Sequence, residues 1–308
     1  MPLVQYSDSE SEDDNPKKGE GDAINPPMKR DDEESSLPPL PAEFRDLYST
    51  SVRASVQDDP SLHDGRARAI PHIVGNWPTH IYLEWYPNHK ELQILSGIIS
   101  TYELKLAEED QLQIHSLLYN ELAVQLPLHI SLSRPVVLLT DQRQRFLDLY
   151  QDEINTSGVR PFRLSMKSLD WVSNSENTRW FLVIRVTRPP NDELNRLLDL
   201  SNIVLAQFNQ TPLYNDAARH QSNSLKHGNT ESSFSRASRP DCSNHFHISI
   251  AWSLMEPSAK QKESLSLLDL NLSEIEVFFK NVKIKIGNHI HSEALPAGIL
   301  RESYLGGI

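Results

Sequence analysis

Apolar and polar residues alternate in several short segments of the chain, which is the pattern of strands with one buried face. In HIYLEW, residues 80–85, the side chains of Ile81, Leu83 and Trp85 alternate with more polar neighbours. The same alternation, or a short apolar run bounded by turn residues, recurs along the chain. We predict further strands at residues 126–133, 136–140, 162–171, 179–187, 245–252 and 282–291.

Turn signals join some of these strands into hairpins, and other segments have the period of helices. NSENT joins residues 162–171 to residues 179–187, and Gly287-Asn288 forms a tight turn within residues 282–291. Residues 89–120 carry apolar residues three and four positions apart, over a length that suits two helices. Thr140 and Asp141 offer an N-cap for a further helix, and another follows Pro189-Pro190-Asn191-Asp192.

Each half of the sequence therefore supplies helices and strands, and each half contains one strand with the letters His-Ile-Ser. We predict an α+β fold of two pseudo-symmetric lobes, each a mainly antiparallel sheet with helices, forming a central groove.

Two segments lack the apolar residues that a folded core requires. Residues 1–42 consist mostly of Asp, Glu, Ser, Pro and Lys, so burial cannot offset the entropy lost on ordering. Residues 217–244 are rich in Ser, Asn, Arg and His and show no apolar period. We predict a disordered acidic tail at residues 1–42 and a single bilobed domain at residues 43–308, with a disordered insertion loop at residues 217–244.

Composition and charge narrow the class of protein. The first residues contain no basic cap followed by an apolar run, and no stretch approaches the ~18 apolar residues of a membrane span, so we expect neither secretion nor a membrane role. The single cysteine, Cys242, excludes an internal disulfide and fits a reducing compartment. The net charge is −12, and residues 1–38 hold eleven acidic and four basic residues. The charge therefore argues against a broad basic surface, and we expect any nucleic acid to be bound through few phosphates.

The two His-Ile-Ser strands place one polar pair twice in an apolar context. His129 and Ser131 occur in LHISLS, and His247 and Ser249 occur in HFHISIAW. A third His-x-Ser, which begins at His220, lies among polar residues of the predicted loop, so the context and not the tripeptide is informative. Alternation sends both polar side chains of a strand to one face. Two such strands side by side would gather two imidazoles and two hydroxyls in one groove.

These four side chains suit cleavage of RNA through its own 2′-hydroxyl. This reaction needs a base for the hydroxyl proton and an acid for the leaving 5′-oxygen, and histidine serves as either near neutral pH. Hydroxyl donors aimed at the phosphoryl oxygens stabilise the transition state without a metal. We predict that His129 and His247 are catalytic and that Ser131 and Ser249 bind phosphate. Which histidine is the acid stays open.

Other interpretations of the same residues also stay open. The histidines can be structural, each bonded to a nearby serine on a partly buried face. A metal site is a second possibility, because His245 and His247 share one strand face, as do His289 and His291. A third is a non-catalytic module that binds RNA 3′ ends or cyclic phosphates. The acidic run SDSESEDD could also recruit a basic partner after phosphorylation.

The sequence resembles the U6 small nuclear RNA 3′-end phosphodiesterase family, within the two-histidine (2H) phosphoesterase superfamily, and is similar to its fungal members. The resemblance covers most of residues 70–300, and the start PLVQYSDSESEDD is also similar. The matching motifs are Gly75-Asn76-Trp77, Thr79-His80, LHISLSR at residues 128–134, FHISIAW at residues 246–252 and Lys285-Ile286-Gly287-Asn288.

This resemblance implies a LigT-like fold and a 3′–5′ exonuclease that removes terminal uridines and leaves a cyclic or linear phosphate end. It implies the catalytic roles of His129 and His247 and the phosphate-binding roles of Ser131 and Ser249. A family tyrosine that stacks on the terminal base corresponds to Tyr214 in FNQTPLYND. Here a 28-residue loop departs from the family pattern by separating this tyrosine from the second motif.

The resemblance also implies the surroundings in which the protein acts. The partner would be the single-stranded, uridine-rich 3′ end of U6 small nuclear RNA, bound by a monomer without metal or cofactor. The location would be the nucleus. Lys17-Lys18 and Lys29-Arg30 have the spacing of a two-part nuclear import signal, although an ordinary solvated tail would look the same.

Overall fold

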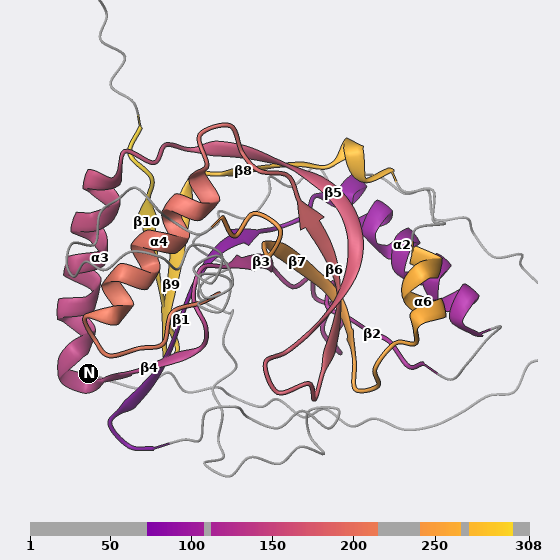
Figure 1. Ribbon diagram of the computed structural model, residues 1–308, viewed down its shortest axis with the longest axis horizontal. Coiled ribbons are helices and arrows are strands. Elements are labelled where there is room, and N and C mark those ends of the chain that lie inside the picture. Colours follow the sequence, from indigo (N-terminus) through magenta and orange to yellow (C-terminus); the bar gives the residue numbers. More distant parts are fainter. Residues whose placement is uncertain (1–72, 108–111, 215–240, 266–270, 298–308) are drawn as a thin grey trace, which may run out of the picture. The chain divides into compact units, whose positions relative to one another are not determined.

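The computed structural model describes residues 73–107, 112–214, 241–265 and 271–297, all within one unit of the chain at residues 49–308 (Figure 1). The predicted tail at residues 1–42 and most of the predicted loop at residues 217–244 lie outside the described residues. Both therefore stay predictions. Among the described helices, none is long and apolar enough to cross a membrane.

The first sheet combines strands from early and late in the chain around β1 (Asn76–Trp85). β4 (Val136–Leu139) pairs with the first part of β1, and β3 (Leu128–Ser131) pairs with its last part. β9 (Asn281–Ile286) also pairs with β1, and β10 (His289–Ala294) extends the sheet beyond β9. All of these pairings are antiparallel.

The second sheet has the order β2-β7-β6-β5-β8 and is also antiparallel. The predicted hairpin forms β5 (Phe162–Ser173) and β6 (Trp180–Val186), and β7 (His247–Ser253) pairs with β6. Two short strands, β2 (His115–Ser116) and β8 (Glu276–Phe279), form its edges.

Two helices lie beside each sheet (Figure 1). α2 (His89–Ala107) and α6 (Ala259–Ser264) lie beside the second sheet, whereas α3 (Arg143–Ser157) and α4 (Glu193–Ala206) lie beside the first. The Tyr102 hydroxyl of α2 donates a hydrogen bond to the Gln261 carbonyl of α6 at 2.7 Å. It also accepts one from the Trp171 indole of β5 at 3.1 Å, so α2 is fixed to its sheet.

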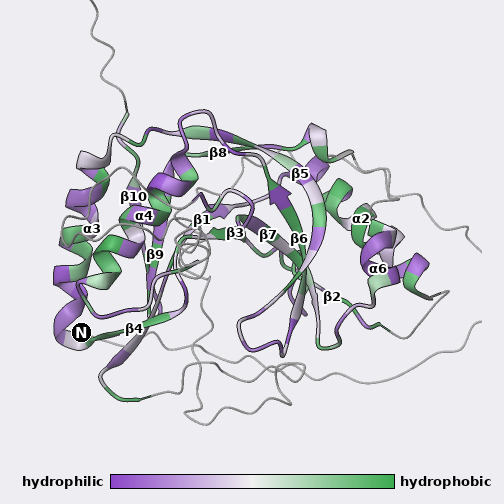
Figure 2. Ribbon diagram, in the orientation of Figure 1, coloured by the Kyte–Doolittle hydropathy of each residue, from purple (hydrophilic) through white to green (hydrophobic). Residues whose placement is uncertain are grey.

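One hydrophobic cluster joins the inner faces of these helices and sheets. The alternating apolar residues of the predicted strands are buried in it, among them Ile81, Leu83, Ile130 and Ile248. In Figure 2, hydrophobic and hydrophilic bands alternate along α3 and α4, as expected for helices with one buried side. The predicted α+β class, with two antiparallel sheets and their helices, is confirmed.

The two lobes do not correspond to the two halves of the sequence. α2 follows β1 of the first sheet but packs on the second sheet, and α4 follows β6 of the second sheet but lies beside the first (Figure 1). The hairpin of β9 and β10, which turns at Gly287-Asn288 as predicted, returns to pair with β1. Chain order therefore interleaves the lobes.

Within residues 89–120 the described part of the chain forms one helix, α2, so the predicted second helix is wrong. His115 and Ser116 instead pair with β7, and the Leu117 amide donates to the Ile250 carbonyl at 2.9 Å. A sheet edge gives this segment both burial and backbone partners, and local periodicity cannot reveal a partner so distant in the chain.

The predicted cap of α3 is also wrong. Thr140 lies in a 3₁₀ turn, η2 (Thr140–Gln142), and Gln142 stands at the N-cap of α3 without a side-chain cap bond. The Thr140 hydroxyl accepts a hydrogen bond from the Trp77 indole at 3.0 Å and lies 3.2 Å from the Gly75 carbonyl, to which it donates. The Thr140 hydroxyl, which the sequence predicted to cap α3, is thus used in a tertiary contact with Trp77.

Substitution of Gly287 by alanine should destabilise the protein by about 1–3 kcal/mol. Gly287 has a φ of +59°, and an added Cβ would lie 2.7 Å from the Trp77 ring, which Thr140 and the overlying Arg143 guanidinium hold in place. Denaturant unfolding of the full chain measures the change.

Gly97→Ala is the matched control, because Gly97 lies in α2 with open space around its added Cβ. It should stabilise the protein by roughly 0.5–1 kcal/mol. Equal effects of the two substitutions would contradict the strain and the clash assigned to Gly287.

Candidate active site

β3 and β7 both turn a histidine and a serine away from the core. The apolar residues of each strand are buried, whereas His129 and Ser131 in β3, and His247 and Ser249 in β7, keep access to solvent. Alternation produces this arrangement, because burying one face leaves the other face for the polar side chains.

The two strands come from different sheets. β3 pairs with β1 in the first sheet and β7 pairs with β6 in the second, and β3 and β7 lie against each other. The charge of His247 contributes to lowering the pKa of His129, so the two imidazoles lie within electrostatic reach. The structure thus brings together both predicted motifs.

His129 lies among other aromatic rings. The His80 and Tyr82 rings are steeply inclined to the His129 ring, at 84° and 66°, with ring centroids 5.5 and 5.6 Å from that of His129. Crowding by protein atoms, and then the charge of His247, lower the pKa of His129 to about 4. One part of the residue stays exposed, so water reaches it and limits the effect of the crowding.

Ser131 has a partner that the sequence did not single out as a site residue. The Nε2 atom of His80 lies 3.1 Å from the Ser131 hydroxyl oxygen. β1 pairs with β3 such that Tyr82 is opposite Ser131 and Glu84 is opposite His129. Alternation in β1 places His80, Tyr82 and Glu84 on that same face, and this parity was the signal that could have identified His80.

The Nδ1 atom of His247 is held by a backbone carbonyl. Its Nδ1 lies 2.7 Å from the carbonyl oxygen of His245. Since a carbonyl only accepts, Nδ1 carries the proton in the neutral ring, and Nε2 keeps a lone pair for chemistry.

The same carbonyl accepts two further donors. The Tyr214 hydroxyl lies 3.1 Å from it, and Nη1 of Arg185 lies 3.3 Å from it. Arg185 is itself fixed by Asp170, whose Oδ2 accepts from Nε at 3.0 Å and from Nη2 at 2.7 Å. No sequence motif indicated that Asp170 and Arg185 would lie next to the second motif.

Several groups around His247 change its pKa. Burial lowers the pKa of His247, and the charges of Arg185 and His245 lower it further. The bond to the His245 carbonyl and the charge of Asp170 oppose this shift. Both candidate catalytic imidazoles therefore favour the neutral form in the free protein.

Tyr214 lies beside the second motif despite the loop that follows it in the sequence. Its ring centroid is 5.0 Å from that of His245 and 6.0 Å from that of Phe246. Tyr214 has a φ of +59° and is partly exposed. Burial raises the pKa of its hydroxyl to about 12, so this group remains a hydrogen-bond donor at neutral pH.

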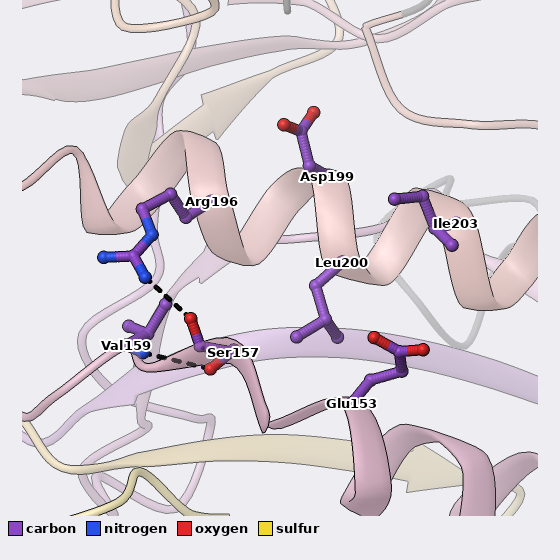
Figure 3. A pocket seen from close by; sticks show the side chains of 7 residues that line it. All are labelled: Glu153, Ser157, Val159, Arg196, Asp199, Leu200 and Ile203. Carbon is purple, nitrogen blue, oxygen red and sulfur yellow. Dashed lines mark hydrogen bonds between the residues drawn. The ribbon is translucent and has the colours of Figure 1, made fainter. Parts of the chain in front are cut away.

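One cavity lies apart from both motifs. A cavity of about 600 Å³ is lined by α3, α4 and the turn after α3, including Glu153, Arg196 and Ile203, and contains neither motif (Figure 3). Within the described residues, no group of three or more His, Cys, Asp and Glu side chains is arranged to hold a metal ion.

The arrangement supplies a base, an acid and hydroxyl donors from two strands. A neutral imidazole can accept a proton through Nε2, and a protonated one can return it to a leaving oxygen. Ser131 and Ser249 each stand two residues beyond a histidine on the same face, where a hydroxyl can donate to an anionic oxygen between the strands.

Comparison with known proteins places this chain in a family. The sequence matches the family described as "HVSL: Uncharacterised conserved protein" over residues 38–294. U6 snRNA phosphodiesterase 1 of Neurospora crassa is 32% identical over 306 residues, which cover 88% of this chain and 78% of that protein. U6 snRNA phosphodiesterase 1 of Homo sapiens is 28% identical over 229 residues, covering 72% and 78%.

Among solved structures, Kluyveromyces marxianus Usb1 superposes with a TM-score of 0.49 at 15% identity, over 71% of this chain and 98% of that one. The sequence matches decide the assignment, because the family match spans most of the chain and the Neurospora crassa match spans most of both proteins. The chain belongs to the U6 snRNA phosphodiesterase 1 family.

Proposed function

We propose that this chain is a metal-independent 3′–5′ exoribonuclease that trims the oligouridine 3′ end of U6 small nuclear RNA. One observation carries the proposal: His129 and His247, each with a serine two residues later, meet from two sheets. The names of the Neurospora crassa and human relatives supply the substrate. The protein would act as a monomer in the nucleus, in keeping with the signal at Lys17-Lys18 and Lys29-Arg30.

In the reaction, one neutral imidazole takes the proton of the penultimate 2′-hydroxyl, and the resulting oxygen attacks the adjacent phosphorus. The bond from phosphorus to the 5′-oxygen breaks, and the other imidazole, protonated, gives its proton to that oxygen. The shortened RNA ends in a 2′,3′-cyclic phosphate, which water can open to a 3′ phosphate. The two imidazoles then recover their starting states by exchange with water.

Two serines and one tyrosine have supporting roles in this proposal. The Ser131 and Ser249 hydroxyls donate to the non-bridging phosphoryl oxygens, whose charge grows toward the transition state. The Tyr214 ring stacks on the terminal base, which requires no base-specific hydrogen bond. A non-catalytic module for RNA ends is not favoured, because both histidines and both serines are present and the relatives are named as phosphodiesterases.

Alanine at either His129 or His247 should lower the rate by several orders of magnitude, because each change removes the acid or the base and leaves the other imidazole without its partner. The measurement is end-group analysis of an oligouridine incubated with the full chain in EDTA. His89→Ala is the control, since His89 is an exposed residue at the start of α2.

The same assay tests attack by the 2′-hydroxyl. A 2′-deoxy substitution at the penultimate nucleotide should block removal of the last one. Cleavage of that substrate at the full rate, or loss of all activity in the chelator, would reject the mechanism.

The pH dependence should separate the free protein from its complex with RNA. The pKa values of His129 and His247 are both lowered in the free protein, so kcat/KM should be maximal below pH 6.5. Activity falls at lower pH as the base becomes protonated, and at higher pH as the acid loses its proton. Bound phosphodiester anion raises both pKa values, so the kcat profile should lie at higher pH. A kcat/KM maximum above pH 7 would be inconsistent with this account.

Tyr214→Ala should weaken RNA binding by about 1–3 kcal/mol, the usual contribution of one stacked base. Tyr214→Phe keeps the ring and removes only the bond to the His245 carbonyl, so it should bind nearly as well. Titration with the uncleavable 2′-deoxy oligouridine measures binding apart from catalysis. Tyr119→Ala, at an exposed tyrosine, is the control, and equal affinities of the two alanine variants would exclude stacking.

A further inference from the structure

His80 touches two of the proposed reaction groups, yet the mechanism above leaves it without a role. Its Nε2 lies 3.1 Å from the Ser131 hydroxyl, and its ring meets the His129 ring edge to face. The His80 ring also stacks on the ring of Tyr82, its neighbour on the same face of β1, at a centroid distance of 5.2 Å. His80 therefore contacts both the hydroxyl and the imidazole of the first motif.

The surroundings of His80 keep its ring uncharged. Burial lowers the pKa of His80 to about 3, and the charges of His129 and Lys285 contribute to this shift. A hydrogen bond to the backbone of Ser133 opposes it. At neutral pH the ring is thus a fixed hydrogen-bonding group and not a second cation at the phosphate.

A serine hydroxyl rotates freely about its own bond unless a partner restrains it. Ser131 lies in the last position of β3, an edge strand of only four residues. The backbone pairing of β3 with β1 fixes its Cα opposite Tyr82 but leaves the hydroxyl direction undetermined. His80 Nε2 supplies the missing restraint.

We propose that His80 is a positioning residue. In the tautomer with the ring proton on Nε2, it donates to the Ser131 oxygen, so the hydroxyl proton is left to point to the phosphoryl oxygen. The His80 ring also packs against the His129 ring. The proposal rests on the function proposed above and assigns His80 no proton transfer of its own. Its contribution passes through Ser131, so the two residues should act as one unit.

The closing experiment is a double-mutant cycle in the full chain, with single-turnover cleavage of oligouridine as the readout. Ser131→Ala should lower the rate on the order of 100-fold, as loss of one transition-state donor does. His80→Phe keeps the aromatic contacts and removes the hydrogen bond, so it should lower the rate about tenfold with little change in KM. In the Ser131→Ala background the same His80→Phe change should have almost no further effect.

A comparison of two amides makes the test independent of folding defects. The terminal amide of glutamine reaches the place of the histidine Nε2, whereas asparagine is shorter and does not. His80→Gln should therefore recover most of the activity lost in His80→Phe, and His80→Asn should not. His89→Phe is the matched control for a histidine-to-phenylalanine change on the surface.

The outcomes distinguish this inference from the proposed function. If His129→Ala abolishes cleavage but His80→Phe cleaves like the wild type, only the positioning role is wrong. Equal rates for His80→Gln and His80→Asn, or multiplicative losses in the double variant, would also overturn it. If His129→Ala cleaves normally, the proposed function itself fails.

Discussion

The pairing of β3 with β1 is the constraint on which the first half of the site depends. Four residue pairs set the register that places Ser131 opposite Tyr82 and His129 opposite Glu84. A slip of one residue would turn Leu128 and Ile130 out to solvent, at a cost of about 1.5–3 kcal/mol for each side chain. The buried apolar residues Leu128 and Ile130 thus determine the face on which the proposed catalytic groups stand.

The second half of the site is held in another way. β7 has a neighbouring strand on each side, and its histidine is further fixed by a carbonyl that three donors share. One of these donors is Tyr214, the proposed base-stacking residue, so the group that would receive the base and the group that would transfer the proton meet at one oxygen. The oxygen is the His245 carbonyl, and the ion pair of Asp170 in β5 with Arg185 in β6 holds the Arg185 donor beside it.

The positions of most strands, although not of β2 and β8, and the outward direction of both motifs could be predicted, because alternation is a local property that burial enforces. The predicted helix after α2 and the cap at Thr140 failed for one reason: both segments have partners far away in the chain, β7 in one case and Trp77 in the other. His80 could have been identified from the sequence, because it shares a face with Tyr82 in β1. Asp170 and Arg185 could not have been identified in this way, because their positions depend on the register of three strands.

The interleaving of the lobes has a consequence for how the protein is made. The first sheet needs β9 and β10, which are among the last residues described, and the second sheet needs α2, which is among the first. The first lobe therefore cannot be completed on the ribosome while the hairpin of β9 and β10 is still inside the exit tunnel. Folding has to close long chain loops before the core is sealed, and such topologies fold slowly.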